Sequence, residues 1–113
     1  MPDCSTNLFI ADFKKACLNN NYYFAQNRKK NINFFLKLGW TVEDMINFLY
    51  NNLSVEHYYK GPELENNPNH YSGIIFAFII TIEEFSFSAY LKIKKVDDSN
   101  KFVIISFHEE GDN

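Results

Sequence analysis

The chain has 113 residues, of which 22% are charged and 46% hydrophobic, and a formal net charge of −3. This length fits one domain with one core, and the apolar content excludes a disordered chain. The two cysteines, Cys4 and Cys17, are too few for a disulfide framework, and no Cys/His cluster suggests a metal. The N-terminus also lacks the pattern of a signal peptide. We therefore expect one cytoplasmic domain over residues 1–113, with no metal or other cofactor.

The charge is unevenly distributed along the chain. Residues 1–40 hold six basic and two acidic residues, 41–70 hold one basic and five acidic, and 71–113 hold four basic and seven acidic. A non-specific nucleic-acid binder is usually basic overall. Any affinity for RNA must therefore come from local patches.

Helices are predicted in the N-terminal half. Ser5 is a suitable N-cap for a first helix that ends near residue 18, before a run of asparagines. A second helix is predicted over about 27–38, where Gly39 is well placed to end it. Its inward side chains are expected to be Ile32, Phe35 and Leu36, with Arg28, Lys29 and Lys30 outward. Between the two helices, residues 22–24 are β-prone and form a candidate short extended segment.

A third helix and a first strand follow. Thr41 opens the helix, with Asp44 at the capping-box position. Its apolar face is expected to consist of Val42, Met45, Ile46, Leu49 and Leu53. Residues 55–60 are predicted to be a strand, and the polar stretch 61–73 a loop.

Three strands are predicted in the C-terminal third, at about 74–83, 87–96 and 101–108. The apolar run 74–82 is too short for a membrane helix and is typical of a buried central strand. The connections are short enough for antiparallel hairpins, so 101–108 should pair with 87–96. Helices followed by strands predict an α+β fold, with the helices packed on a mainly antiparallel four-stranded sheet.

Within the predicted strand 87–96, residues 88–94 alternate strictly, with Tyr90, Lys92 and Lys94 on one face and Leu91 and Ile93 on the other. The last strand ends in a polar tip at His108. In a hairpin, a phenol, several ammonium groups and an imidazole would lie close together. These groups suit the binding and acid–base cleavage of a phosphodiester. No Walker loop, HExxH or GxSxG motif is present, which disfavours nucleotide-dependent, zinc-dependent and serine-hydrolase classes.

Several segments, taken together and in this order, resemble the MqsR family of type II toxins over about residues 35 to 110. They are Leu38-Gly39, the helix with Met45, Leu53-Ser54, Tyr58-Tyr59-Lys60-Gly61-Pro62, Tyr90-Leu91-Lys92-Ile93 and Ile105-Ser106-Phe107-His108-Glu109. The resemblance implies a RelE-like α+β fold. It also implies a metal-independent mRNA endonuclease that a neighbouring antitoxin holds inactive.

By position, the resemblance implies an active-site lysine at Lys60, an active-site tyrosine at Tyr90 and a basic residue at His108. The family has a further polar or basic residue in the strand after the long loop, and the apolar strand 73–80 has nothing to match it. His108 would act as the acid and Lys60 would stabilise the phosphorane. Tyr90 would orient the phosphate or stack on a base.

Further candidate RNA contacts are His57, Tyr58, Tyr59, His70, Lys92 and Lys94. Each has an ordinary alternative: a packed strand histidine, a polar loop residue, a half-buried aromatic or a solvated lysine. His108 has the alternative of a solvent-exposed strand end. The basic run 28–30 is either a solvated helix start or a contact to phosphates of mRNA or ribosomal RNA.

Two functions remain open from the sequence. The first is a toxin that cleaves mRNA, single-stranded or ribosome-associated, by 2′-hydroxyl attack, with a cognate antitoxin as its partner. The second is a small acidic, non-catalytic inhibitor that binds a protein through the same scaffold. The acidic net charge and the apolar strand 74–82 favour the second.

Overall fold

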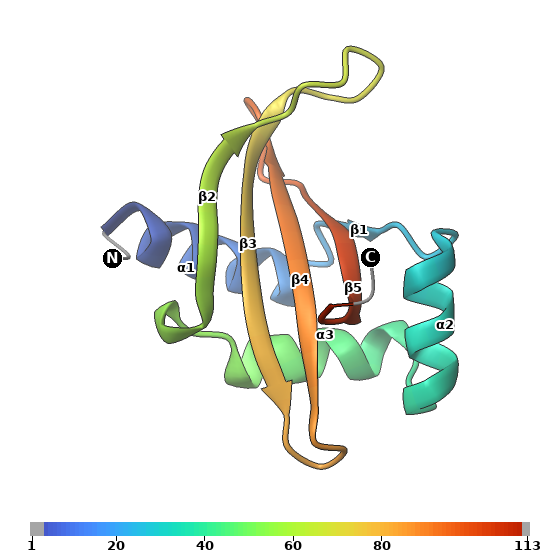
Figure 1. The fold of residues 1–113 in the computed structure, drawn as a ribbon. Helices are drawn as coiled ribbons and strands as arrows, with labels where there is room; N and C mark the ends of the chain where they lie inside the picture. Colours follow the sequence, from blue (N-terminus) through green and yellow to red (C-terminus); the bar gives the residue numbers. More distant parts are fainter. Residues whose placement is uncertain (1–3, 112–113) are drawn as a thin grey trace.

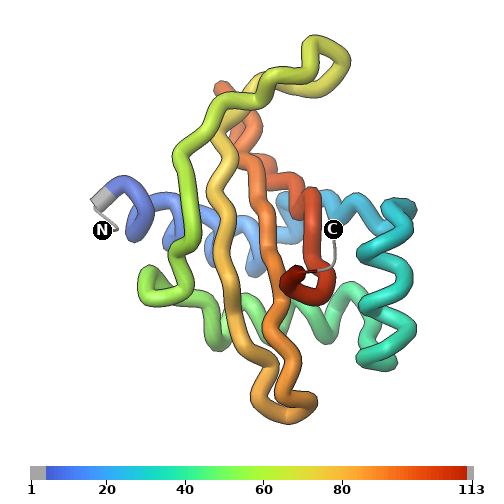
Figure 2. Tube along the Cα trace, viewed as in Figure 1, coloured from blue at the N-terminus to red at the C-terminus, as the bar shows by residue number. Residues whose placement is uncertain are grey.

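The computed structural model describes residues 4–111 as helices packed against a single sheet (Figure 1). The helical elements are α1 (Cys4–Leu18), α2 (Lys29–Leu38), α3 (Val42–Asn52) and the 3-10 turn η1 (Val55–His57). The strands are β1 (Tyr22–Phe24), β2 (Tyr58–Leu64), β3 (Gly73–Ile82), β4 (Phe87–Val96) and β5 (Phe102–Glu109). Helices α1 and α3 lie behind the sheet and α2 stands beside β5 (Figures 1 and 2). One face of the sheet is therefore covered by helices, and the other, which we call the open face, is not.

The α+β architecture is confirmed, but the prediction of a four-stranded sheet is wrong. The sheet has five strands in the order β1-β5-β4-β3-β2. The β2–β3, β3–β4 and β4–β5 pairs are antiparallel, whereas β1 pairs with β5 in parallel, from Tyr22 opposite Phe102 to Phe24 opposite Ile104. A three-residue segment that pairs with a strand some 80 residues away leaves no local signal, because parallel partners share no turn. As predicted, β3 is interior and β5 pairs with β4, although β4 is the middle strand of the five.

The core lies between the helices and the covered face of the sheet. Its largest fully buried side chains are Phe13, Phe78, Phe102, Phe107, Met45, Leu49, Leu53, Ile80, Ile82, Leu91, Ile93 and Ile104. Phe9 of α1 stands with its ring centroid 4.4 Å from that of Phe76 and 5.4 Å from that of Phe102. Large rings from α1, β3 and β5 thus supply much of the buried area in a small domain.

Helix α2 presents a different face to the sheet from the predicted one. Asn31, Phe34 and Leu38 are buried, whereas Ile32 is 42% and Leu36 77% exposed. The prediction counted apolar residues only, and it therefore missed a polar residue at an inward position. Only Phe35 of the predicted inward set is partly buried against the core.

The inward polar residue, Asn31, replaces a missing stretch of strand at the edge of β5. Strand β1 covers that edge only along residues 102–104. Beyond it, the Asn31 side chain accepts a hydrogen bond from the Phe107 N–H (2.9 Å) and donates one to the Ile105 carbonyl (3.1 Å). The same amide also donates to the Ala25 carbonyl at 2.9 Å. The side chain satisfies buried backbone groups that would otherwise lack partners.

The first predicted strand, 55–60, is also shifted. Residues 55–57 form η1, in which the Ser54 N–H donates to His57 Nδ1 (3.1 Å), and β2 runs from Tyr58 to Leu64. The expected loop 61–73 is consequently shortened to residues 65–72. Pro62 is tolerated within β2 because this is an irregular edge strand, with register shifts on either side of Lys60.

Two local signals are confirmed and one is displaced. Thr41 Oγ1 accepts from the Asp44 N–H (3.1 Å), and an Asp44 carboxylate oxygen accepts from the Thr41 N–H (2.9 Å), which completes the capping box. Gly39 ends α2 in the left-handed conformation with φ of 73°. Helix α1 already includes Cys4, so Ser5 lies within the helix and is not its N-cap.

We expect Asn31→Ala to lower the free energy of unfolding by about 2–4 kcal/mol, because a buried Phe107 N–H is left without a partner. Asn33→Ala, at an exposed position of the same helix, is the matched control and should change stability by less than about 0.5 kcal/mol. Urea-induced unfolding measures both. Equal stabilities for the two variants would contradict the structural role given to Asn31.

Candidate functional site

The open face carries a row of rings across three strands. Tyr90 of β4 stands directly opposite His108 of β5, with ring centroids 5.4 Å apart. On the other side of Tyr90, the Tyr59 ring lies 6.2 Å away in an edge-on arrangement. We call Tyr59, Tyr90 and His108 the aromatic row. The juxtaposition of Tyr90 and His108 that the alternating sequence pattern predicted is therefore present.

His108 is only 8% exposed, which excludes the alternative of a solvent-exposed strand-end residue. The β4–β5 pairing continues past it to Ala89 opposite Glu109, which places it inside the sheet. Its Nδ1 lies 3.0 Å from the Glu109 carbonyl oxygen. A carbonyl can only accept, so Nδ1 carries the hydrogen and the lone pair of the neutral ring is on Nε2. Nε2 is thus the atom available for proton transfer.

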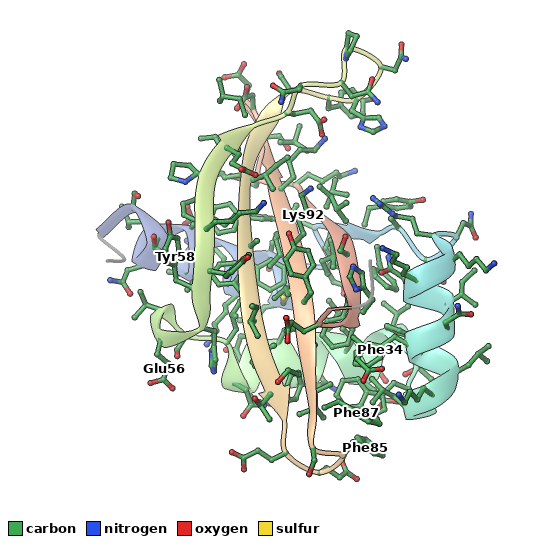
Figure 3. All side chains as sticks on the ribbon, in the orientation of Figure 1. Phe34, Glu56, Tyr58, Phe85, Phe87 and Lys92 are labelled. Carbon is green, nitrogen blue, oxygen red and sulfur yellow. The ribbon has the colours of Figure 1, made fainter. Side chains whose placement is uncertain are left out.

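Lys92 and Lys60 stand in the next row along the sheet. The register aligns Lys60 of β2, Ala77 of β3, Lys92 of β4 and Ser106 of β5. Lys92 is two residues from Tyr90 and projects from the open face (Figure 3). Lys60 is three strands from His108, about 14 Å or more between Cα atoms at ordinary strand spacing. Lys92 is therefore the lysine better placed to share a phosphate with His108.

Lys94 does not have the solvent-facing position that strand alternation suggested. It is 4% exposed, and its Nζ donates to Glu65 Oε1 (3.0 Å) and to the Tyr71 carbonyl (2.8 Å). The hydrogen bond from Lys94 holds the pKa of the Glu65 carboxyl below its ordinary value. These contacts attach the 65–72 segment to the sheet. Lys94 is thereby a structural anchor whose charge is already neutralised.

A groove of about 1270 Å³ lies over the β4–β5 part of the open face, between the 65–72 segment and the β1–α2 region. We call it the upper groove. Its lining residues are Tyr23, Ala25, Arg28, Glu65, Asn67, Pro68, Asn69, His70, Tyr71, Ile75, Lys92, Lys94, Val96, Ser99, Lys101, Val103 and Ile105. Sequence reasoning missed Tyr23, Tyr71 and Lys101 as site residues. The parallel β1–β5 pairing brings Tyr23 and Arg28 to this groove, and no local pattern encodes that pairing.

The remaining candidates lie in different environments. His70 is in the groove wall, with Nδ1 3.6 Å from Glu65 Oε1. Tyr58 packs against the core, 6.4 Å from the Phe76 ring, and its hydroxyl donates to the Gly61 carbonyl at 2.6 Å. His57 accepts from the Ser54 N–H in η1. Tyr58 and His57 are thus engaged in local structure and lie outside the aromatic row.

Other reactive groups offer no competing site in the part of the chain that the structure describes. Within residues 4–111, no group of His, Cys, Asp and Glu side chains is arranged to hold a metal ion. The Cys17 thiol is buried, and burial raises its pKa to about 11, which excludes it as a nucleophile at neutral pH. Among the same residues, no helix has the length and apolar character required to cross a bilayer.

Comparisons with known proteins give no relatives. The sequence matches no protein-family profile and no curated protein, and the fold matches no solved structure.

Acidification should release the 65–72 segment. Since the folded-state pKa of Glu65 lies below the ordinary value of 4.5, its stabilising contribution is complete above pH 4.5 and is lost as the pH falls through the folded-state value. As the pH falls, we expect two amides to exchange faster relative to the amides of β4. They are the Asp97 N–H, which donates to the Ser72 carbonyl, and the Glu65 N–H, which donates to the Gly73 carbonyl. Hydrogen exchange followed by NMR, relative to β4 amides, measures this.

Glu65→Gln should produce the same increase at neutral pH, because it leaves the buried Lys94 charge uncompensated. Glu63→Gln is the matched control, since Glu63 is exposed and its carboxylate lies 4.0 Å from Lys60 Nζ. Unchanged exchange in Glu65→Gln would contradict the anchoring role of the Lys94–Glu65 pair.

Proposed function

We propose that the protein is a metal-independent endoribonuclease toxin of the MqsR kind, which cleaves mRNA by 2′-hydroxyl attack. The observation that carries the proposal is the pairing of Tyr90 and His108 on the open face, with Lys92 in the next row. A phenol, an imidazole and an ammonium group in adjacent register positions are the groups that such cleavage needs. The resemblance assigns Tyr90, His108 and Lys60 to the active site independently of this geometry.

In the proposed reaction His108 is the general acid. The 2′-oxygen attacks phosphorus and its proton passes to water, while the bond to the 5′-oxygen breaks and that oxygen takes a proton from Nε2. The products are a 2′,3′-cyclic phosphate and a 5′-hydroxyl. The hydrogen bond from Nδ1 to the Glu109 carbonyl fixes the orientation of the ring and leaves Nε2 as the atom that gives the proton.

The lysines divide between two phosphates. Lys92 stabilises the charge on the non-bridging oxygens at the reacting phosphate. Lys60, across Ala77, contacts a neighbouring phosphate of the same strand. Tyr90 and Tyr59 stack on bases of a single-stranded substrate, since bases within a duplex do not present their faces.

The proposed biological partner is a cognate antitoxin, and the proposed location is the cytoplasm, where mRNA is translated. A ribonuclease that acts on mRNA, free or on the ribosome, arrests its host unless it is neutralised. Covering the aromatic row or the access to it would be sufficient for neutralisation.

A second candidate function is a non-catalytic inhibitor that binds a protein. Its support is the apolar character of β3 on the open face, where Ile75, Ala77 and Ile79 stand between β2 and β4 without a polar group. In this case growth would be unaffected by substitutions that remove an acid–base group.

The decisive experiment is induction in a bacterial host, with mapping of RNA 5′ ends and analysis of the terminal groups. We expect growth arrest, 5′-hydroxyl ends and no effect of EDTA on cleavage by the purified protein. His108→Ala should lower the cleavage rate by about two to four orders of magnitude, as loss of a general acid does. Lys92→Ala should lower it less.

Because His108 is buried, the variant requires a folding control. Thermal unfolding should show that His108→Ala and His108→Gln remain folded. Lys15→Ala, at an exposed position of α1, is the control for the loss of a cation in Lys92→Ala. Full toxicity in a folded His108→Ala protein, or a requirement for magnesium, would refute the assignment. A folded wild-type protein without any effect on RNA would favour the second candidate.

A further inference from the structure

The upper groove lies beside the aromatic row and, apart from Lys92, its lining residues have no role in the proposed cleavage step. Its floor consists of β4 and β5, one wall is the 65–72 segment, and the other is formed by β1 and the start of α2. Lys92 lines the groove and is also two residues from Tyr90 along β4. A linear ligand that passes the aromatic row can therefore continue along β5 into the groove.

The groove carries uncompensated positive charge, although the protein is acidic overall. Arg28, Lys92 and Lys101 line it, and their side chains have no hydrogen-bond or ion-pair partner among residues 4–111. The one acidic lining residue, Glu65, is already paired with Lys94. Three free cations around one groove are suited to an anionic ligand with several charges.

Two tyrosines stand at the groove without packing against the core. Tyr71 is 80% and Tyr23 55% exposed, and neither ring contacts another aromatic ring in the described part of the chain. They lie on opposite walls, Tyr71 on the 65–72 segment and Tyr23 on β1. Exposed aromatic rings interleaved with cations are the combination that binds unpaired nucleotides, because phosphates meet cations and bases stack on rings.

We infer that the upper groove binds the single-stranded RNA that flanks the scissile phosphate. Lys92 meets the scissile phosphate at the entrance, Arg28 and Lys101 bind the phosphates beyond it, and Tyr71 and Tyr23 stack on bases. This inference rests on the proposed function for the identity of the strand, but binding in the groove does not require cleavage. Arg28, Lys101 and the two groove tyrosines thus supply affinity, whereas His108 and Lys92 supply the chemistry.

A single strand fits these observations better than the other anionic ligands. A duplex hides its base faces in the stack, so it would leave both tyrosines without a role. An acidic protein segment would satisfy the cations, but the carboxylate side chains that do so offer no rings to stack on Tyr71 and Tyr23. The tyrosines are therefore the feature that distinguishes RNA from an acidic partner.

The probe for the test is a short fluorescent oligouridylate with 2′-O-methyl riboses, which cannot be cleaved by 2′-hydroxyl attack. For single strands the logarithm of affinity falls with the logarithm of salt concentration with a slope of about −0.7 per phosphate contact. Three contacts predict a slope of about −2, so affinity should fall about 20-fold between about 50 and 200 mM salt.

Arg28→Ala and Lys101→Ala should each weaken binding and reduce that fall to about 7-fold, because one phosphate contact is lost. Lys29→Ala and Lys14→Ala remove cations outside the groove and are the matched controls, with slopes expected to equal that of the unaltered protein. Tyr71→Leu should weaken binding at least about 5-fold. Tyr50→Leu, on the exposed face of α3, should have no effect.

Each remaining outcome overturns the inference. The first three are an absence of binding, salt slopes that Arg28→Ala and Lys101→Ala leave unchanged, and equal affinity for a duplex. The fourth is displacement of the oligonucleotide by polyglutamate that is insensitive to Tyr71→Leu, and it would indicate an acidic protein partner. Cleavage assays separate this inference from the proposed function. Binding that depends on the groove residues, without any cleavage, would support the inference about the groove and refute the proposed nuclease activity. Cleavage that the groove variants do not affect would refute only the inference about the groove.

Discussion

The contact between Asn31 and the edge of β5 is the constraint on which the open face depends. Strand β5 has one extra residue, Ile105, because Ile93 pairs with Ile104 while Lys92 pairs with Ser106. After this bulge the alternation of side chains resumes, with Phe107 facing the core and His108 facing the open face. The Asn31 side chain binds the backbone at residues 105 and 107, at the bulge and just beyond it. Phe107 consequently enters the core, and His108 is directed to the open face opposite Tyr90.

A second polar contact determines the shape of the open face. Lys94 follows the same alternation as Tyr90 and Lys92, yet it is used to hold the 65–72 segment through Glu65 and the Tyr71 carbonyl. A buried ion pair of this kind contributes little net stability compared with an apolar pair. Its effect here is geometric, because it fixes a segment without regular structure as a wall of the upper groove. Lys94 thus shapes the groove, whereas Lys92, on the same face of β4, remains free to contact a ligand in it.

Local signals made much of the fold predictable, and long-range pairing limited the rest. The capping box at Thr41 and the left-handed Gly39 depend on neighbours within four residues, so the sequence contains them complete. The hairpin that joins Tyr90 to His108 follows from alternation and a short turn. The segment 22–24 and Asn31 act on β5 from more than 70 residues away, and periodicity carries no information about such partners. For the same reason Arg28, for which the sequence left open a solvated helix start or a phosphate contact, could not be assigned to the groove.

The acidic net charge does not oppose the proposed binding of RNA on this face, because electrostatic interactions between exposed charges are short-ranged in salt. At physiological ionic strength the screening length is about 8 Å, so the carboxylates of α3 and of the β3–β4 turn contribute little at the upper groove. Among the lining residues the sole carboxylate is neutralised by Lys94. Asp97 and Asp98, in the β4–β5 turn, are the nearest remaining negative charges along the chain and lie outside the lining. In the proposed function, a strand that avoids the turn would meet Lys101, Arg28 and Lys92, so that the distribution of charge, not its sum, would direct it toward His108.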